Sequence, residues 1–97
     1  MTADITVTGR PDGCFEVVVD DGRSRTSHVV TVPTGLAGEL GAPGCDDSRI
    51  VRSSFEFLLE REPATSILQR FRLDVIERYF PEYRHEMARR LTGRGSA

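Results

Sequence analysis

The chain has 97 residues, of which 38% are hydrophobic and 29% are charged, and its formal net charge is −2. This length allows one small domain, and the composition excludes both an intrinsically disordered chain and a strong polyelectrolyte. Lysine and asparagine are absent, so all 13 basic residues are arginines. Both missing residues have AT-rich codons, so the pattern is typical of a GC-rich genome. Arginine content alone is therefore no sign of nucleic-acid binding.

The chain shows no signal-peptide pattern at its start and no apolar run long enough to cross a bilayer. We therefore expect a cytoplasmic protein that does not contact a membrane. In that compartment Cys14 and Cys45 are expected to be reduced thiols and not a disulfide. A core at this length is thin, and self-association, for example as a homodimer, is one way to cover the remaining apolar surface.

The first third of the chain alternates polar and apolar residues with a period of two, which predicts strands. A turn at residues 9–13 separates the first strand from the second. A two-residue turn, either Asp21-Gly22 or Gly22-Arg23, separates the second from a third strand at residues 25–32. Either turn sets Phe15 and Val17 beside the apolar face of the third strand. The sequence predicts a three-stranded antiparallel meander over residues 1–32, and the shared face of its third strand consists of Thr26, His28, Val30 and Val32.

The pattern after Pro33 becomes helical. A short helical turn is expected around residues 36–40, and the glycine-rich segment that follows ends this turn. A long helix then begins at residues 46–48, which supply capping side chains, and ends before Pro63. The apolar arc of this helix is wide, which predicts contact with the sheet on one side and with later helices on the other.

Two or three short helices are expected after Pro63. An apolar stripe formed by Ile67, Leu68 and Phe71 indicates the first, and Asp74 to Glu77 match a capping box that opens the second. The final helix has Pro81 in its first turn and pairs Glu86 with Arg89 or Arg90. We therefore expect one α+β domain over residues 1–92, with a helical half at 46–92 and a frayed tail at 93–97. The apolar face of the final helix consists of Tyr83, Met87 and Leu91.

His28 is the residue that first suggests catalysis, because Cys14 and Glu16 lie on the neighbouring strand. The favoured register places His28 on the face of Phe15 and Val17, and Glu16 on the opposite face. We therefore expect a half-buried structural histidine and a protein that is not an enzyme. An enzyme that uses Cys14 or His28 is the weaker alternative.

Neither a metal site nor a phosphate-binding loop has a specific signal. Cys14, His28, Cys45 and Asp46 lack the close ligand pairs of a zinc motif, so the cysteines are expected to be packing residues. Glycines recur at positions 35, 38, 41 and 44, but no lysine and no GxGxxG pattern accompanies them. We expect no metal and no cofactor, and a loose connection in which glycines adopt positive φ.

The helical half is rich in aromatic and apolar residues, more than a small interior needs. A groove or self-association surface rimmed by arginine is therefore expected. The leading hypothesis is a protein-interaction or regulatory module whose partner is another protein or a second copy of the chain. Its candidate surface consists of Phe57, Tyr79, Tyr83 and Met87.

Nucleic-acid binding is the alternative hypothesis. Residues 67–80 loosely resemble a helix-turn-helix with arginines on its outer side, but no glycine occupies the turn. Glu77 and Glu82 lie among these arginines and offset part of their attraction to phosphate. The candidate contacts are Arg70, Arg72, Arg78, Arg84, Arg89 and Arg90.

One segment resembles a known pattern. Residues 55–83 read FEFLLEREPATSILQRFRLDVIERYFPEY, which resembles a segment of short bacterial proteins that are themselves uncharacterised. The resemblance covers these 29 residues well and the rest of the chain loosely. It implies a bacterial, intracellular setting and carries over no catalytic or binding residue.

Overall fold

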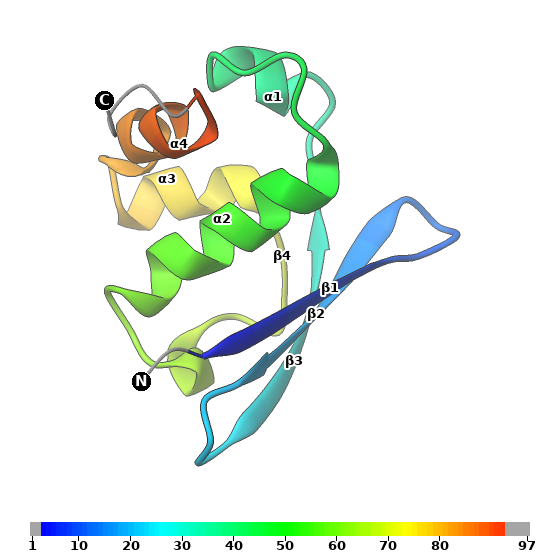
Figure 1. Cartoon of the computed structure of the whole chain (residues 1–97), viewed down its shortest axis with the longest axis vertical. Coiled ribbons are helices and arrows are strands. Elements are labelled where there is room, and N and C mark those ends of the chain that lie inside the picture. The colour runs from blue at the N-terminus through cyan, green and yellow to red at the C-terminus, as the bar shows by residue number, and fades with distance from the viewer. Residues whose placement is uncertain (1–2, 93–97) are drawn as a thin grey trace.

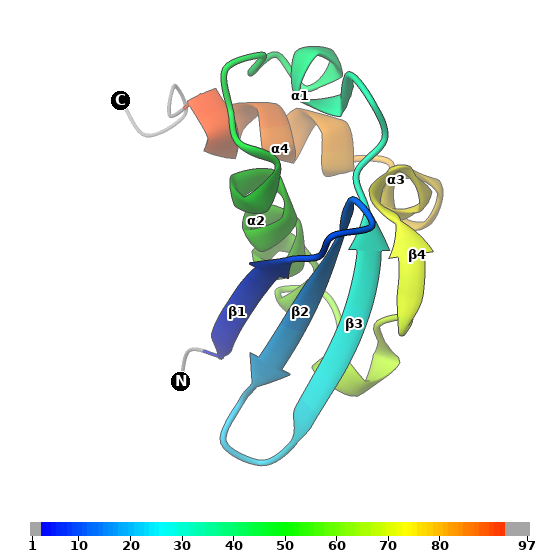
Figure 2. The ribbon, with the colours of Figure 1, turned by 90° about the vertical axis from the view of Figure 1, so that its right-hand side faces the viewer.

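A computed structural model describes residues 3–92 and shows a mixed four-stranded sheet with helices packed on one side (Figure 1). The strands are β1 (Asp4–Gly9), β2 (Cys14–Asp20), β3 (Arg25–Thr31) and β4 (Arg70–Arg72), and they lie in the order β1-β2-β3-β4. Figure 2 faces the uncovered side of this sheet. The α+β class is confirmed, but the sheet has a fourth strand, parallel to β3, that the meander prediction lacks.

The register of the β2–β3 hairpin is the predicted one. Phe15 lies opposite Val30, and Val17 lies opposite His28. Asp21 donates its backbone N–H to the carbonyl of Ser24 at 3.2 Å, so Gly22 and Arg23 form the tip of the turn. Gly22 has φ of 88°, a conformation that favours glycine, and this selects the Gly-Arg turn over the Asp-Gly turn.

Strand β4 replaces the short helix predicted around Ile67, Leu68 and Phe71, so that prediction is wrong. Val29 donates its backbone N–H to the Gln69 carbonyl at 2.7 Å, and this bond brings the segment to the open edge of β3. In the strand, Phe71 pairs with Val30 and turns its ring toward Phe55, with ring centroids 6.0 Å apart. Burying Phe71 against the sheet stabilises the extended form over a helical turn. The helix-turn-helix interpretation of residues 67–80 is therefore also wrong.

Helix α2 (Asp47–Leu59) lies between the sheet and helix α4 (Tyr83–Thr92) (Figure 1). This position explains the wide apolar arc and confirms that the helix makes contact on two sides. Ile50, Val51, Ser54, Phe55, Phe57 and Leu58 are the buried residues of α2.

The remaining helices are short. Helix α1 (Leu36–Glu39) follows Gly35, which has φ of 82°, and two 3-10 helices span Ala64–Ser66 and Leu73–Val75. Helix α3 (Ile76–Tyr79) begins later than the capping box predicts. Asp74 lies in a 3-10 helix and pairs with Arg72 at 3.3 Å, and no side-chain hydrogen bond caps α3 among the described residues.

Helix α4 follows the prediction closely, although it begins at Tyr83, two residues after Pro81. Tyr83, Met87 and Leu91 are buried against the rest of the core. Glu86 pairs with Arg89 at 3.5 Å and with Arg90 at 3.7 Å, so both predicted ion pairs form. One continuous apolar core joins the sheet to the helices. The predicted frayed tail at 93–97 lies outside the described residues.

Candidate functional site: an apolar pocket beside strand β4

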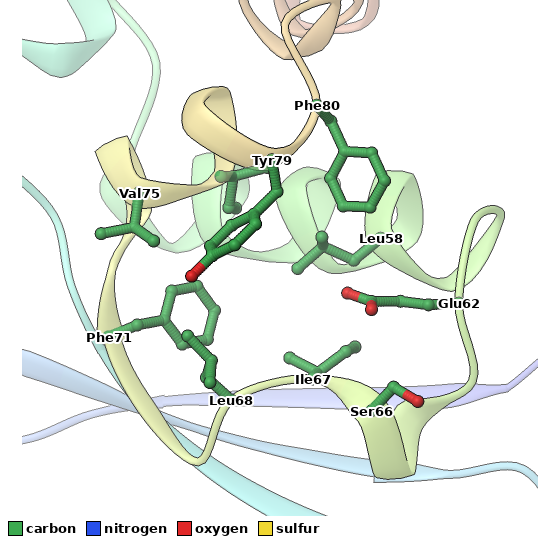
Figure 3. Close-up of a pocket in the computed structure, with 10 residues that line it drawn as sticks. Leu58, Glu62, Ser66, Ile67, Leu68, Phe71, Val75, Tyr79 and Phe80 are labelled. Atoms are coloured by element: carbon green, nitrogen blue, oxygen red, sulfur yellow. The ribbon is translucent and has the colours of Figure 1, made fainter.

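A cavity of about 240 Å³ lies between the end of α2, strand β4 and helix α3 (Figure 3). We call it the β4 pocket. The chain forms it by leaving α2, passing through the first 3-10 helix into β4, and returning as α3. Its lining residues are Leu58, Glu62, Ser66, Ile67, Leu68, Phe71, Val75, Ile76, Tyr79 and Phe80.

Two large apolar side chains at this pocket are exposed to solvent. Leu68 has 50% of its surface exposed and Tyr79 has 67%, whereas the other large apolar residues of residues 3–92 are buried or half-buried. Phe71, Val75 and Phe80 are half-buried beside them. Scattered single apolar residues are normal on a protein surface, but adjacent ones around a concavity are typical of a binding site.

Glu62 supplies the charged group of the pocket. Its carboxylate points into the cavity, between Leu58 and Phe80 on one side and Ile67 on the other (Figure 3). The side chain is half-buried, and within residues 3–92 it has no ion pair and no hydrogen-bond partner. Nearby Arg61 is already engaged, because it pairs with Glu82 at 2.9 Å.

His28 supports the rim of the pocket from inside the sheet. Its Nδ1 lies 2.8 Å from the carbonyl oxygen of Leu68, and its Nε2 lies 2.9 Å from Oγ1 of Thr26. Because the carbonyl oxygen only accepts, Nδ1 donates, and in the neutral ring Nε2 accepts from the Thr26 hydroxyl. The ring also packs on Phe55 at a centroid distance of 5.2 Å.

His28 therefore has the structural role that the sequence predicts, on the predicted face of the sheet. It is more buried than predicted, since only 2% of the residue is exposed. Glu16 pairs in register with Val29 and so lies on the opposite face, which leaves His28 without a carboxylate partner from that strand. Both ring nitrogens form hydrogen bonds, so the His28 ring is held in place and supports the backbone of Leu68.

The structure corrects the predicted interaction surface. Phe57 and Met87 are fully buried and Tyr83 is 2% exposed, so only Tyr79 of the four candidates lies on the surface. Phe57 packs edge-on against Tyr83 at 5.4 Å and against Phe80 at 5.9 Å, and the Arg61 guanidinium lies 3.7 Å from its ring centroid. These side chains are buried because α4 and the chain before it cover the outer side of α2.

Tyr83 carries a buried polar contact within this core. Its hydroxyl lies 2.8 Å from Oγ of Ser54, which itself donates to the Ile50 carbonyl at 2.7 Å. The Tyr83 hydroxyl is therefore the donor in the pair. Burial raises the pKa of Tyr83 to about 12.

The six candidate arginines for nucleic acid are spread over three parts of the fold, and most are paired with acids. Arg84 pairs with Glu77 at 2.9 Å and with Glu39 at 3.5 Å. Arg90 pairs with Glu60 at 2.6 Å. Pairing with Arg84 also lowers the pKa of Glu77, as expected for an acid held in its charged form. Of the six, Arg72, Arg84, Arg89 and Arg90 form ion pairs, whereas Arg70 and Arg78 form none within residues 3–92.

The cysteines lie in separate places. Cys14 Sγ is 3.5 Å from Oγ1 of Thr31, and Cys45 Sγ is 3.8 Å from the Leu91 carbonyl oxygen. Both are free thiols and half-buried. Among the described residues no three His, Cys, Asp or Glu side chains gather in a way that suits a metal ion.

Comparisons with protein-family models, with curated proteins and with solved structures give no match for this chain. The resemblance of residues 55–83 to short bacterial proteins therefore stays a prediction. Across the part of the chain that the structure describes, no helix is both long and apolar enough to span a membrane.

Sequence reasoning missed three residues of the pocket that matter, Glu62, Leu68 and Phe71. The alternation in Arg70-Phe71-Arg72 is the signal that identifies an extended segment with one inward side chain. It spans only three residues, and the apolar stripe from Ile67 to Phe71 also fits a helical turn. No local pattern marks Glu62, because its place in the pocket depends on how the chain returns along the sheet.

Proposed function

We propose that this protein is a non-enzymatic interaction module that binds a segment of another protein in the β4 pocket. The observation that carries the proposal is that the two exposed large apolar side chains of residues 3–92, Leu68 and Tyr79, border the same cavity. Leaving them in water is unfavourable, and a partner that covers them gains roughly 25 cal/mol for each Å² of apolar surface removed from water. The bacterial, cytoplasmic setting inferred from the sequence belongs to this proposal.

The composition of the pocket supports protein recognition. Tyrosine and phenylalanine side chains are typical anchors of protein interfaces, since they supply a large contact area with little conformational freedom to lose. Phe71 and Phe80 make ring contacts with the buried Phe55 and Phe57, so these walls pack against the core and are formed before binding. A preformed site avoids part of the ordering cost of association.

The test is a selection of peptides from a displayed random library against the wild-type protein, followed by affinity measurements on variants. Leu68→Ser and Tyr79→Ser each remove an exposed anchor, so each is expected to weaken the selected peptides by at least about tenfold. Val18→Thr is the matched control. Val18 is half-buried on the uncovered face of the sheet, between Thr6 and Ser27, and its change should leave binding unaltered.

Two results would refute the proposal. Selected peptides that tolerate both pocket variants but lose affinity with Val18→Thr would place the interface on the uncovered face of the sheet. A wild-type dimer, detected by light scattering, that Leu68→Ser converts to a monomer would show that a second copy of the chain occupies the pocket in place of another protein.

A further inference from the structure

The unpaired carboxylate in the β4 pocket indicates what kind of segment binds there. Residues 3–92 contain four half-buried acidic residues, and the carboxylates of three of them have polar partners. Asp21 accepts hydrogen bonds from the Arg23 and Ser24 backbone, Glu77 pairs with Arg84, and Glu86 pairs with Arg89 and Arg90. Glu62 is the fourth, and it has neither an ion pair nor a hydrogen-bond partner in the described part of the chain.

The surroundings of Glu62 favour a cation that comes from outside. A carboxylate that is partly removed from water and unpaired is destabilised relative to a paired one. Arg61, its neighbour in sequence, is held by Glu82, and no arginine of residues 3–92 lines the β4 pocket. Apart from Ser66, the rest of the wall is apolar or aromatic (Figure 3), so it suits the methylene stem of a basic side chain.

Aromatic side chains add to this preference. Tyr79 and Phe80 both border the cavity into which Glu62 points. The face of an aromatic ring attracts a cation, and the attraction grows when the cation is shielded from water. The pocket therefore combines a negative charge, aromatic rings and an apolar floor in a volume of about 240 Å³.

We propose that the β4 pocket receives a lysine or arginine side chain of the partner segment, whose charged group pairs with Glu62 while neighbouring apolar residues of the segment cover Leu68 and Tyr79. This inference rests on the proposed function and specifies the chemistry of the partner. An acidic segment would instead bring like charge against Glu62 and bind more weakly.

The test uses three peptides that differ at one position: acetyl-Leu-Ser-Lys-Ser-Leu-amide and its counterparts with glutamine or glutamate in place of lysine. In an extended chain the central side chain and the two leucines project to the same side. Binding is followed by amide chemical shifts of the ¹⁵N-labelled protein, at peptide concentrations up to about 10 mM because short peptides bind weakly. The lysine peptide is expected to bind about tenfold more tightly than the glutamine peptide, and the glutamate peptide most weakly.

Two variants separate the charge of Glu62 from the overall charge of the protein. Glu62→Gln is expected to abolish the preference for lysine over glutamine. Glu56→Gln is the control, since Glu56 is an exposed acid of α2 outside the β4 pocket, and it should keep the preference. The preference should also shrink as salt concentration rises.

The outcomes distinguish this inference from the proposed function. If all three peptides shift the Leu68 and Tyr79 amides with equal affinity, or if Glu62→Gln keeps the preference for lysine, the pocket binds protein segments but the role of Glu62 is refuted. If none of the three peptides shifts those amides although a library-selected peptide does, the inference is refuted and the proposed function stands. If no library-selected peptide shifts them either, both are refuted.

Discussion

Replacing Tyr83 by phenylalanine tests whether its hydroxyl is buried and hydrogen-bonded to Ser54. At neutral pH the variant loses one buried hydrogen bond, while Ser54 keeps its bond to Ile50, so the free energy of unfolding should fall by about 1 kcal/mol. Ser54→Ala should cost more, because it leaves the buried Tyr83 hydroxyl without a partner. Urea unfolding at pH 7 measures both effects.

The pH dependence gives a sharper result. The pKa of Tyr83 rises from its ordinary value of 10.0 to about 12 in the folded protein. A group whose pKa is raised by folding stabilises the folded state below the unfolded pKa and loses this contribution as pH rises. As pH rises, Tyr83 therefore loses its proton in the unfolded chain before it does so in the folded protein. Between about pH 9 and pH 11, the unfolding free energy of the wild type should fall by roughly 1 kcal/mol relative to that of Tyr83→Phe.

Tyr79→Phe is the matched control for this experiment. Tyr79 is exposed, so its variant should show the same loss of stability with rising pH as the wild type. A difference in unfolding free energy between wild type and Tyr83→Phe that stays constant from pH 7 to about pH 11 would refute the buried position of the Tyr83 hydroxyl.

Three further predictions concern His28, which contacts the Leu68 backbone at the pocket, and charged residues on the protein surface. His28→Ala should lower the unfolding free energy by about 2–4 kcal/mol in urea titrations, because it removes both the partner of the Leu68 carbonyl and a ring packed on Phe55. A decrease below about 0.5 kcal/mol would contradict the structural role of His28. Glu60→Gln should cost less than about 1 kcal/mol, because Glu60 is exposed. The hydrogen bond from Arg90 lowers the pKa of Glu60 below 4.5, so this small contribution is present at neutral pH and disappears as pH falls below that value, which acid titrations of both proteins would show. Duplex DNA should not bind to the protein at about 150 mM salt in fluorescence anisotropy, because four of the six candidate arginines are paired with acids. Salt-dependent binding that is weakened by Arg70→Gln and Arg78→Gln would support the nucleic-acid hypothesis instead.

The elements that the sequence predicts well are those with a repeated local signal. The period-two alternation around Val17 and His28, together with the glycine at position 22, defines a hairpin whose register the structure confirms. Helices α2 and α4 carry apolar residues at helical spacing over several turns, so their existence and buried faces were predictable.

The parts that could not be predicted depend on contacts between distant residues. Strand β4 is three residues long, and it forms because the edge of β3 offers hydrogen-bond partners to a segment some 40 positions further along the chain. The burial of Phe57 depends likewise on α4 crossing the outer side of α2. Which aromatic residues remain exposed is therefore decided by tertiary packing, and sequence alone identified only Tyr79 of the exposed pair.

Chemical-shift mapping with a library-selected peptide shows whether a partner segment binds in the β4 pocket. With the amide resonances of the ¹⁵N-labelled protein assigned, we expect the largest shifts at Glu62, Leu68, Phe71 and Tyr79. Shifts that gather instead at Val18 and Val29, on the uncovered face of the sheet, would contradict it.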